Sequence, residues 1–215
     1  MKFSQLNLEE RGITPVGIIG DCGVGKTYIT ELTKKTLFNI FNFNSRTYEG
    51  DKYTFGPYVK NEKLARHVFN RTFRSVKEVH KHILANESPE LLRTLVSESA
   101  PFMAEDILTD IHTAITSENP PNFILMESVI LPMLEEIYGN ITKKGRVIAP
   151  ESKVISSTME RDGKSEEEVR KVIAERKWAF SPWEDETTNG IYNINNPHDG
   201  TEKQEVEGFC EFLID

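Results

Sequence analysis

The stretch that decides the fold of this chain is Gly20-Asp21-Cys22-Gly23-Val24-Gly25-Lys26-Thr27. It has the spacing G-x-x-x-x-G-K-T, in which glycines let the backbone curl until several N–H groups face one anion. The lysine brings a positive charge to the β- and γ-phosphates of a nucleotide, and the threonine hydroxyl is a ligand for Mg²⁺. We therefore predict that residues 20–27 bind the phosphates of ATP, with Lys26 taking part in catalysis and Thr27 in metal binding.

The residues on both sides of the loop support this interpretation. Residues 15–19 (P-V-G-I-I) form a short apolar run that is typical of a buried parallel strand. Residues 28–38 carry Ile29, Leu32, Thr33 and Leu37 at the spacing of one helical face. The N-terminus of this helix would face the phosphate, where its dipole favours a negative charge. Strand, glycine loop and helix together are the context that the motif requires.

Composition limits the class of protein. The chain has 215 residues, with 26 basic and 34 acidic side chains and a net charge of −8. That length suits a single α/β domain over residues 1–215, and the charge predicts neither nucleic acid nor an anionic membrane as a partner. The two cysteines, Cys22 and Cys210, do not suggest a disulfide framework or a zinc site. With no apolar run of membrane-spanning length and no secretory leader, we expect a cytoplasmic protein.

Apolar runs and helical patterns alternate along the chain. Further strands are expected at residues 45–49, 123–127, 146–149 and 191–194. Helical spacing covers residues 59–84 and 101–117, and other helices are expected to begin at Pro89 and after Pro150. Residues 165–168 and 201–204 both have the pattern of a capping box. The alternation predicts a three-layer α/β fold, with a parallel sheet of about five strands and helices on both faces.

Ligands of such sheets bind at the carboxyl ends of the strands. Asp51 follows the second expected strand, and Glu127 ends the strand at residues 123–127. We expect Asp51 to accept a proton from an acceptor hydroxyl or to align it, with Glu49 as the competing candidate and a simple turn aspartate as the alternative. Glu127 is the candidate for supporting Mg²⁺ beside Thr27, unless it is only a solvated carboxylate at a strand end.

Two classes of phosphate-loop protein fit poorly. Small GTPases need an N-K-x-D motif to recognise guanine, and this chain has none. Motor and AAA-type ATPases usually have an Asp-Glu pair after the third strand, whereas Glu127 is followed by Ser128.

Four further segments occur in the order found in small-molecule kinases. They are residues 64–69 (L-A-R-H-V-F), 123–134 (F-I-L-M-E-S-V-I-L-P-M-L), 159–165 (M-E-R-D-G-K-S) and 192–196 (Y-N-I-N-N). With the glycine loop, the chain resembles the P-loop nucleotide kinase superfamily, most closely dephospho-CoA kinase and nucleoside monophosphate kinases. The resemblance implies an enzyme that uses ATP and Mg²⁺ to phosphorylate a nucleotide-type small molecule. Lys60-Asn61 stands where dephospho-CoA kinases have Asp-Arg, so a nucleoside, a nucleoside monophosphate and dephospho-CoA stay open as acceptors.

The same resemblance assigns regions and charged residues. It implies a lid at residues 159–178, in which Arg161 closes over the γ-phosphate, and a helical acceptor-binding region at residues 52–120. Residues 1–12 would be an N-terminal extension, and residues 192–196 would lie near the adenine. Further candidate cations are Lys164, Arg170 and Arg176 in the lid, and Lys52, Lys60, Arg66, Arg71 and Arg74 on the acceptor side. The alternatives are a P-loop ATPase that acts as a switch and a nucleotide-binding scaffold without kinase activity.

Overall fold

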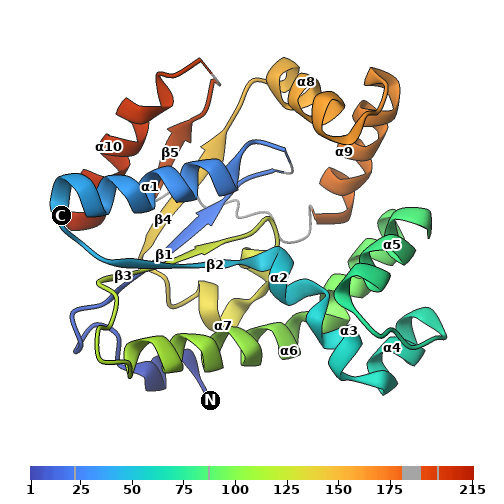
Figure 1. The fold of residues 1–215 in the computed structure, drawn as a ribbon, viewed down its shortest axis with the longest axis horizontal. Coiled ribbons are helices and arrows are strands. Elements are labelled where there is room, and N and C mark those ends of the chain that lie inside the picture. Colours follow the sequence, from blue (N-terminus) through green and yellow to red (C-terminus); the bar gives the residue numbers. More distant parts are fainter. Residues whose placement is uncertain (22, 87, 181–189, 198) are drawn as a thin grey trace.

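A computed structural model describes residues 1–21, 23–86, 88–180, 190–197 and 199–215. One sheet runs through its centre, with the strand order β2-β3-β1-β4-β5, and every pair of neighbouring strands is parallel (Figure 1). The strands are β1 (Thr14–Ile19), β2 (Ser45–Glu49), β3 (Phe123–Glu127), β4 (Lys143–Ile148) and β5 (Ile191–Asn195). The predicted five-stranded parallel sheet is thus confirmed.

Helices cover both faces of this sheet. α1 (Lys26–Phe41) and α10 (Glu202–Ile214) lie on one face, and α6 (Pro89–Ile115) and α7 (Glu135–Tyr138) lie on the other (Figure 1). Strand β3, which lies between β2 and β1, supplies both cores: Phe123 and Leu125 pack in the cluster with α1 and α10, whereas Ile124 and Met126 pack in the cluster with α6. All five of its residues are buried, and the first four are apolar, as expected for a strand covered on both faces.

The remaining helices flank the carboxyl edge of the sheet. In Figure 1, α8 and α9 lie on one side of this edge and the short helices α2 to α5 on the other. These helices are α2 (Gly50–Thr54), α3 (Gly56–Lys60), α4 (Glu62–Phe69), α5 (Val76–Asn86), α8 (Glu151–Asp162) and α9 (Glu166–Phe180). Two 3₁₀ turns, η1 (Phe3–Leu6) and η2 (Leu131–Met133), complete the described elements. No helix among the described residues combines the length and the hydropathy that crossing a membrane requires.

The structure corrects three of the expected helices. Residues 59–84 belong to three helices, because Asn61 caps the start of α4 and Asn70 ends it in the left-handed conformation. Conversely, α6 continues through Pro101, where two helices were expected. Buried side chains precede and follow this proline, including Leu95 and Met103, so packing on the sheet holds the helix together across the missing N–H.

The start of β4 was predicted at residue 146, which is too late, because the first two residues of the strand are lysines. The Lys143 ammonium lies 4.6 Å from the ring centroid of Phe212, and the Lys144 ammonium lies 3.8 Å from that of Tyr138. Lysine stems can cover apolar surface while the charged ends stay at its border. The strand therefore begins three residues before its apolar pattern does.

One of the two expected capping boxes is present. The Ser165 N–H donates to Glu168 Oε2 at 2.8 Å, and the Glu168 N–H donates to Ser165 Oγ at 3.4 Å, as predicted before α9. Before α10 the prediction was wrong. The Thr201 hydroxyl donates to Asp199 Oδ1 at 2.7 Å and makes no cap hydrogen bond to the helix.

Candidate active site

The glycine loop joins β1 to α1 and is closely packed. Gly20, Gly23 and Gly25 have φ values of 148°, 85° and 87°, which side chains other than glycine rarely tolerate. A Cβ atom on Gly20 would lie 2.6 Å from the carbonyl oxygen of Val147 in β4. A Cβ atom on Gly23 would lie 2.8 Å from the Val154 side chain in α8. The motif therefore needs glycine for its backbone shape and for the space around it.

The loop brings together two predicted metal-site residues that are 100 positions apart in sequence. Thr27 lies in the first turn of α1, and Glu127 ends β3, the strand paired with β1. The Thr27 hydroxyl donates to Glu127 Oε1 at 3.0 Å. Only 7% of Glu127 is exposed, so this residue is not the solvated strand-end carboxylate that was the alternative interpretation. A hydroxyl and a carboxylate are hard oxygen ligands of the kind that Mg²⁺ uses together with water and nucleotide phosphates.

Lys26 begins α1 directly beside this pair. Its ammonium group donates to the carbonyl oxygen of Asp21 at 2.8 Å, so the side chain folds back along the loop. Cys22 lies outside the described residues.

A cavity of about 360 Å³ opens in front of the loop. Its walls come from the loop and α1, the end of β3, and the facing sides of α8 and α9. The lining residues are Gly23, Gly25, Lys26, Thr27, Glu127, Ser128, Val129, Ser157, Thr158, Arg161, Val172, Ile173 and Arg176. The predicted phosphate loop and the predicted lid therefore line the same cavity.

Two arginines of the predicted lid line this cavity. Arg161 is held by its neighbour, since its Nε and Nη2 donate to the two carboxylate oxygens of Asp162 at 2.7 and 2.9 Å. The hydrogen bonds from this guanidinium lower the pKa of Asp162. Arg176 lies on the same face of α9 as Val172 and Ile173. The three- and four-residue spacing to these two apolar residues is the sequence signal that could have singled out Arg176.

Arg170, which the sequence grouped with Arg176, lies elsewhere. Its guanidinium donates to Glu151 Oε1 at 2.6 Å and to Glu166 Oε1 at 2.9 Å, and it does not line the cavity. Both are exposed ion pairs, and of the two only the pair with Glu151 joins α8 to α9.

The backbone of Asp51 lies at the carboxyl edge of the sheet, where β3 also ends. It lies in the first turn of α2, directly after β2, and the β2–β3 register places Glu49 opposite Glu127. Gly50 packs so closely on β3 that a Cβ atom there would lie 2.5 Å from the Cβ of Ser128. The side chain of Asp51 lies outside the described part of the chain. The competing candidate, Glu49, forms an ion pair with Lys52 at 2.5 Å.

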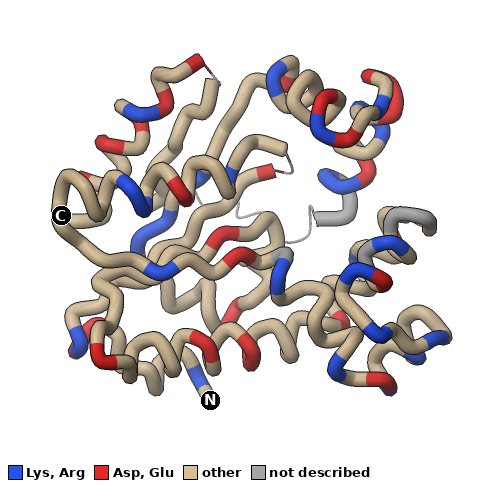
Figure 2. The backbone as a smooth tube through the Cα atoms, in the orientation of Figure 1, with Lys and Arg blue, Asp and Glu red and all other residues tan. Residues whose placement is uncertain are grey.

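The acceptor-side cations do not line the described cavity. Lys60 pairs with Asp106 at 2.6 Å, Arg66 lies 3.8 Å from Glu62, and Arg71 lies over the ring of Phe73. Figure 2 shows basic and acidic residues interleaved over the helices that carry them. These contacts are on the surface of the helical region.

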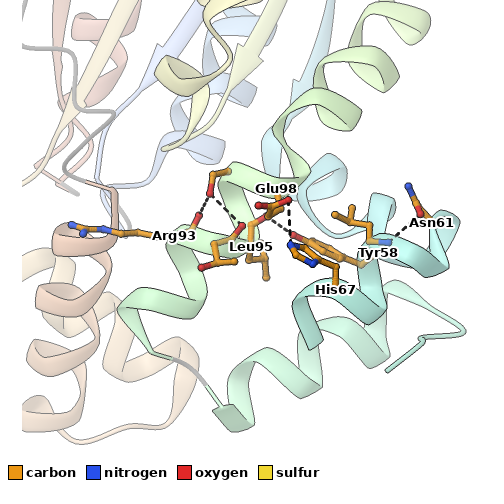
Figure 3. Close-up of polar contacts among 9 residues, drawn as sticks. Tyr58, Asn61, His67, Arg93, Leu95 and Glu98 are labelled. Carbon is orange, nitrogen blue, oxygen red and sulfur yellow. Dashed lines mark hydrogen bonds and ion pairs between the residues drawn. The ribbon is translucent and has the colours of Figure 1, made fainter. Parts of the chain in front are cut away.

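The interior of the helical region is held by polar contacts to α6 (Figure 3). The buried Tyr58 hydroxyl donates to the carbonyl oxygen of Leu95, and burial raises the pKa of this tyrosine. On the surface of the same helices, His67 Nε2 lies 4.0 Å from Glu98 Oε2. In Figure 3 the Arg93 side chain extends away from this group. α6 also contacts α9, which belongs to the predicted lid.

Within the described ranges, no three His, Cys, Asp or Glu side chains gather to hold a metal ion. Trp183 and His198 lie outside the described residues, as do the side chains of Trp178 and His80.

Comparison with known proteins gives the fold. No protein-family model and no curated protein sequence matches the chain. Among solved structures, TT1252 from Thermus thermophilus is similar with a TM-score of 0.60 and 19% identity, over 90% of this chain and 93% of that one. Shikimate kinase from Bacteroides thetaiotaomicron is similar with a TM-score of 0.52 and 15% identity, over 94% and 99%. These likenesses do not single out dephospho-CoA kinase. Together with the strand order and the glycine loop, they show that the chain has the α/β fold of P-loop kinases.

Proposed function

We propose that this protein is an ATP- and Mg²⁺-dependent small-molecule kinase that transfers the γ-phosphoryl group to a nucleotide-type acceptor. The observation that carries the proposal is the contact between Thr27 and Glu127 at 3.0 Å beside Lys26, in the lining of a cavity. Catalysis of phosphoryl transfer consists mostly of aligning the reactants and neutralising charge. The residues that line this cavity are suited to both tasks.

The backbone amides of residues 20–27 would bind the β-phosphate, with Lys26 placed between the β- and γ-phosphate oxygens. Thr27 and Glu127 would hold Mg²⁺ together with water, and the metal would supply charge neutralisation on the phosphates. Arg161 and Arg176 would approach the transferred group from α8 and α9, where positive charge stabilises the transition state.

On the acceptor side, Asp51 would accept the proton of the attacking hydroxyl or hold that hydroxyl in line. Its position after β2 brings it to the edge of the sheet where β3 ends in Glu127. A nucleoside, a nucleoside monophosphate and dephospho-CoA remain the candidate acceptors. They would lie between the lid and the helical region of residues 52–120.

A screen of acceptors tests the proposal directly. ADP release is measured with ATP and Mg²⁺ in the presence of deoxynucleoside monophosphates, nucleosides or dephospho-CoA, one at a time. We expect one acceptor class to raise ADP release, and Lys26→Ala to abolish the increase. Lys35→Ala is the matched control, because Lys35 is an exposed lysine on the same helix.

Slow ATP hydrolysis that no acceptor stimulates would contradict the kinase assignment and favour a P-loop ATPase. ATP binding without any turnover would favour a scaffold.

A further inference from the structure

The phosphate loop is tied to a strand that does not belong to the motif. Asn196 follows β5, which lies two strands away from β1 in the sheet. Its side-chain Nδ2 donates to the carbonyl oxygen of Val24 at 2.8 Å, across 172 residues of sequence. Asn196 is fully buried, and its own backbone N–H donates to the carbonyl oxygen of Ile148 at 2.7 Å. The end of β4 therefore fixes the residue that holds the loop.

This hydrogen bond determines how one peptide unit of the loop is oriented. In a trans peptide the carbonyl of one residue and the N–H of the next point in opposite directions. No peptide bond in the described chain is cis, so holding the Val24 carbonyl toward Asn196 turns the Gly25 N–H away from Asn196. Gly25 lines the cavity and Asn196 does not. The N–H that is turned away from Asn196 thus belongs to a residue that lines the cavity.

The Val24 side chain holds the loop from a second direction. It is 95% buried and packs in the same apolar cluster as Val147 and Val154. Its neighbours Gly23 and Gly25 have positive φ values and no side chains that could fix the loop by packing. With the side chain packed and the carbonyl hydrogen-bonded, Val24 is held in one orientation between two flexible residues.

We propose that Asn196 is a positioning residue for the phosphate site: it holds the Val24 carbonyl away from the bound phosphates and aims the Gly25 amide at them. This inference builds on the proposed function, since it assumes that the loop binds phosphates. Without the hydrogen bond, the Val24–Gly25 peptide can rotate and present a carbonyl oxygen to the anion, which repels it.

The test compares equilibrium binding of Mg²⁺-ATP and of inorganic tripolyphosphate, which has phosphates but no base or ribose. Asn196→Asp replaces the amide donor with a carboxylate of the same shape, and Asn196→Ala removes it. We expect both variants to raise the Kd for both ligands about tenfold, or about 1.4 kcal/mol. Asn140→Asp is the matched control, because Asn140 Nδ2 also donates to a backbone carbonyl, that of Glu136 at 2.7 Å, far from the loop. It should leave both Kd values unchanged.

Folded Asn196 variants with wild-type affinity for tripolyphosphate would overturn the inference. Weaker binding of ATP alone would overturn it too, because Asn196 would then act on the base or ribose. If both variants fail to fold, the wild-type protein still decides: tripolyphosphate should shift the Gly25 amide resonance strongly, and an unshifted Gly25 refutes the argument. Phosphoryl transfer is not measured in these experiments. A protein that binds both ligands as expected but phosphorylates no acceptor would refute the proposed function alone.

Discussion

Replacing Glu127 with glutamine tests the metal site with little change in shape. The amide oxygen can still accept the hydrogen bond that the Thr27 hydroxyl makes at 3.0 Å, so α1 should stay docked on β3. What is lost is the negative charge of a side chain that is only 7% exposed. Substituting a residue that supports a metal in this way typically lowers metal affinity or activity about 10- to 100-fold. A shift of that size corresponds to about 1.4 to 2.7 kcal/mol.

The assay is ADP release as a function of Mg²⁺ concentration at saturating ATP. We expect Glu127→Gln to raise the Mg²⁺ concentration for half-maximal activity by that factor. The melting temperature should not fall, because an amide is easier to bury than a carboxylate. Glu118→Gln, which changes an exposed glutamate, is the control. An unchanged Mg²⁺ dependence in Glu127→Gln would refute the reasoning, and a large loss of stability would show that the carboxylate has a structural role instead.

Three further substitutions test the neighbouring features. Gly23→Ala should abolish ATP binding and destabilise the fold by more than Gly163→Ala, measured by calorimetry and urea unfolding, because Gly163 also has a positive φ but has open space for a methyl group. Arg176→Gln should lower kcat about 10-fold or more while Arg170→Gln leaves it unchanged, since of these two arginines Arg176 alone lines the cavity. Equal effects of the two substitutions on kcat would remove Arg176 from the site. The buried Glu202 accepts hydrogen bonds from its own backbone N–H and from the Tyr28 hydroxyl, and these lower its pKa. The ionised carboxylate therefore stabilises the fold above the usual glutamate pKa, and this stability is lost as the pH falls through the lowered pKa. Urea unfolding between about pH 3 and 6 should therefore be less steeply pH-dependent in Glu202→Gln than in wild type, and identical profiles would contradict this.

The sequence was most informative where a local pattern reflects a local requirement. The spacing from Gly20 to Thr27 predicted a loop whose three glycines all have positive φ values, because only glycine adopts that backbone easily. The run at residues 123–127 predicted strand β3, because burial on both faces favours apolar side chains, which fill the first four of its five positions. These two segments, with the alternation of strands and helices, were enough to predict the class of fold.

Patterns failed where packing overrides a local preference. Pro101 indicated a break in a helix that burial keeps continuous, and the paired lysines at the start of β4 concealed strand residues whose stems lie along aromatic rings. Such outcomes depend on neighbours that are distant in sequence and leave no local signal.

The sequence by itself therefore determined a glycine loop with the spacing of a phosphate-binding motif on a parallel α/β sheet. Only the tertiary structure decided that Glu127 meets Thr27, that Arg176 lines the cavity while Arg170 does not, and that Asn196 holds the loop. The physical reason is that the backbone shape of the loop is dictated by its own glycines. Each of these three arrangements instead brings together segments that are far apart in the chain, and strand order and helix packing set it.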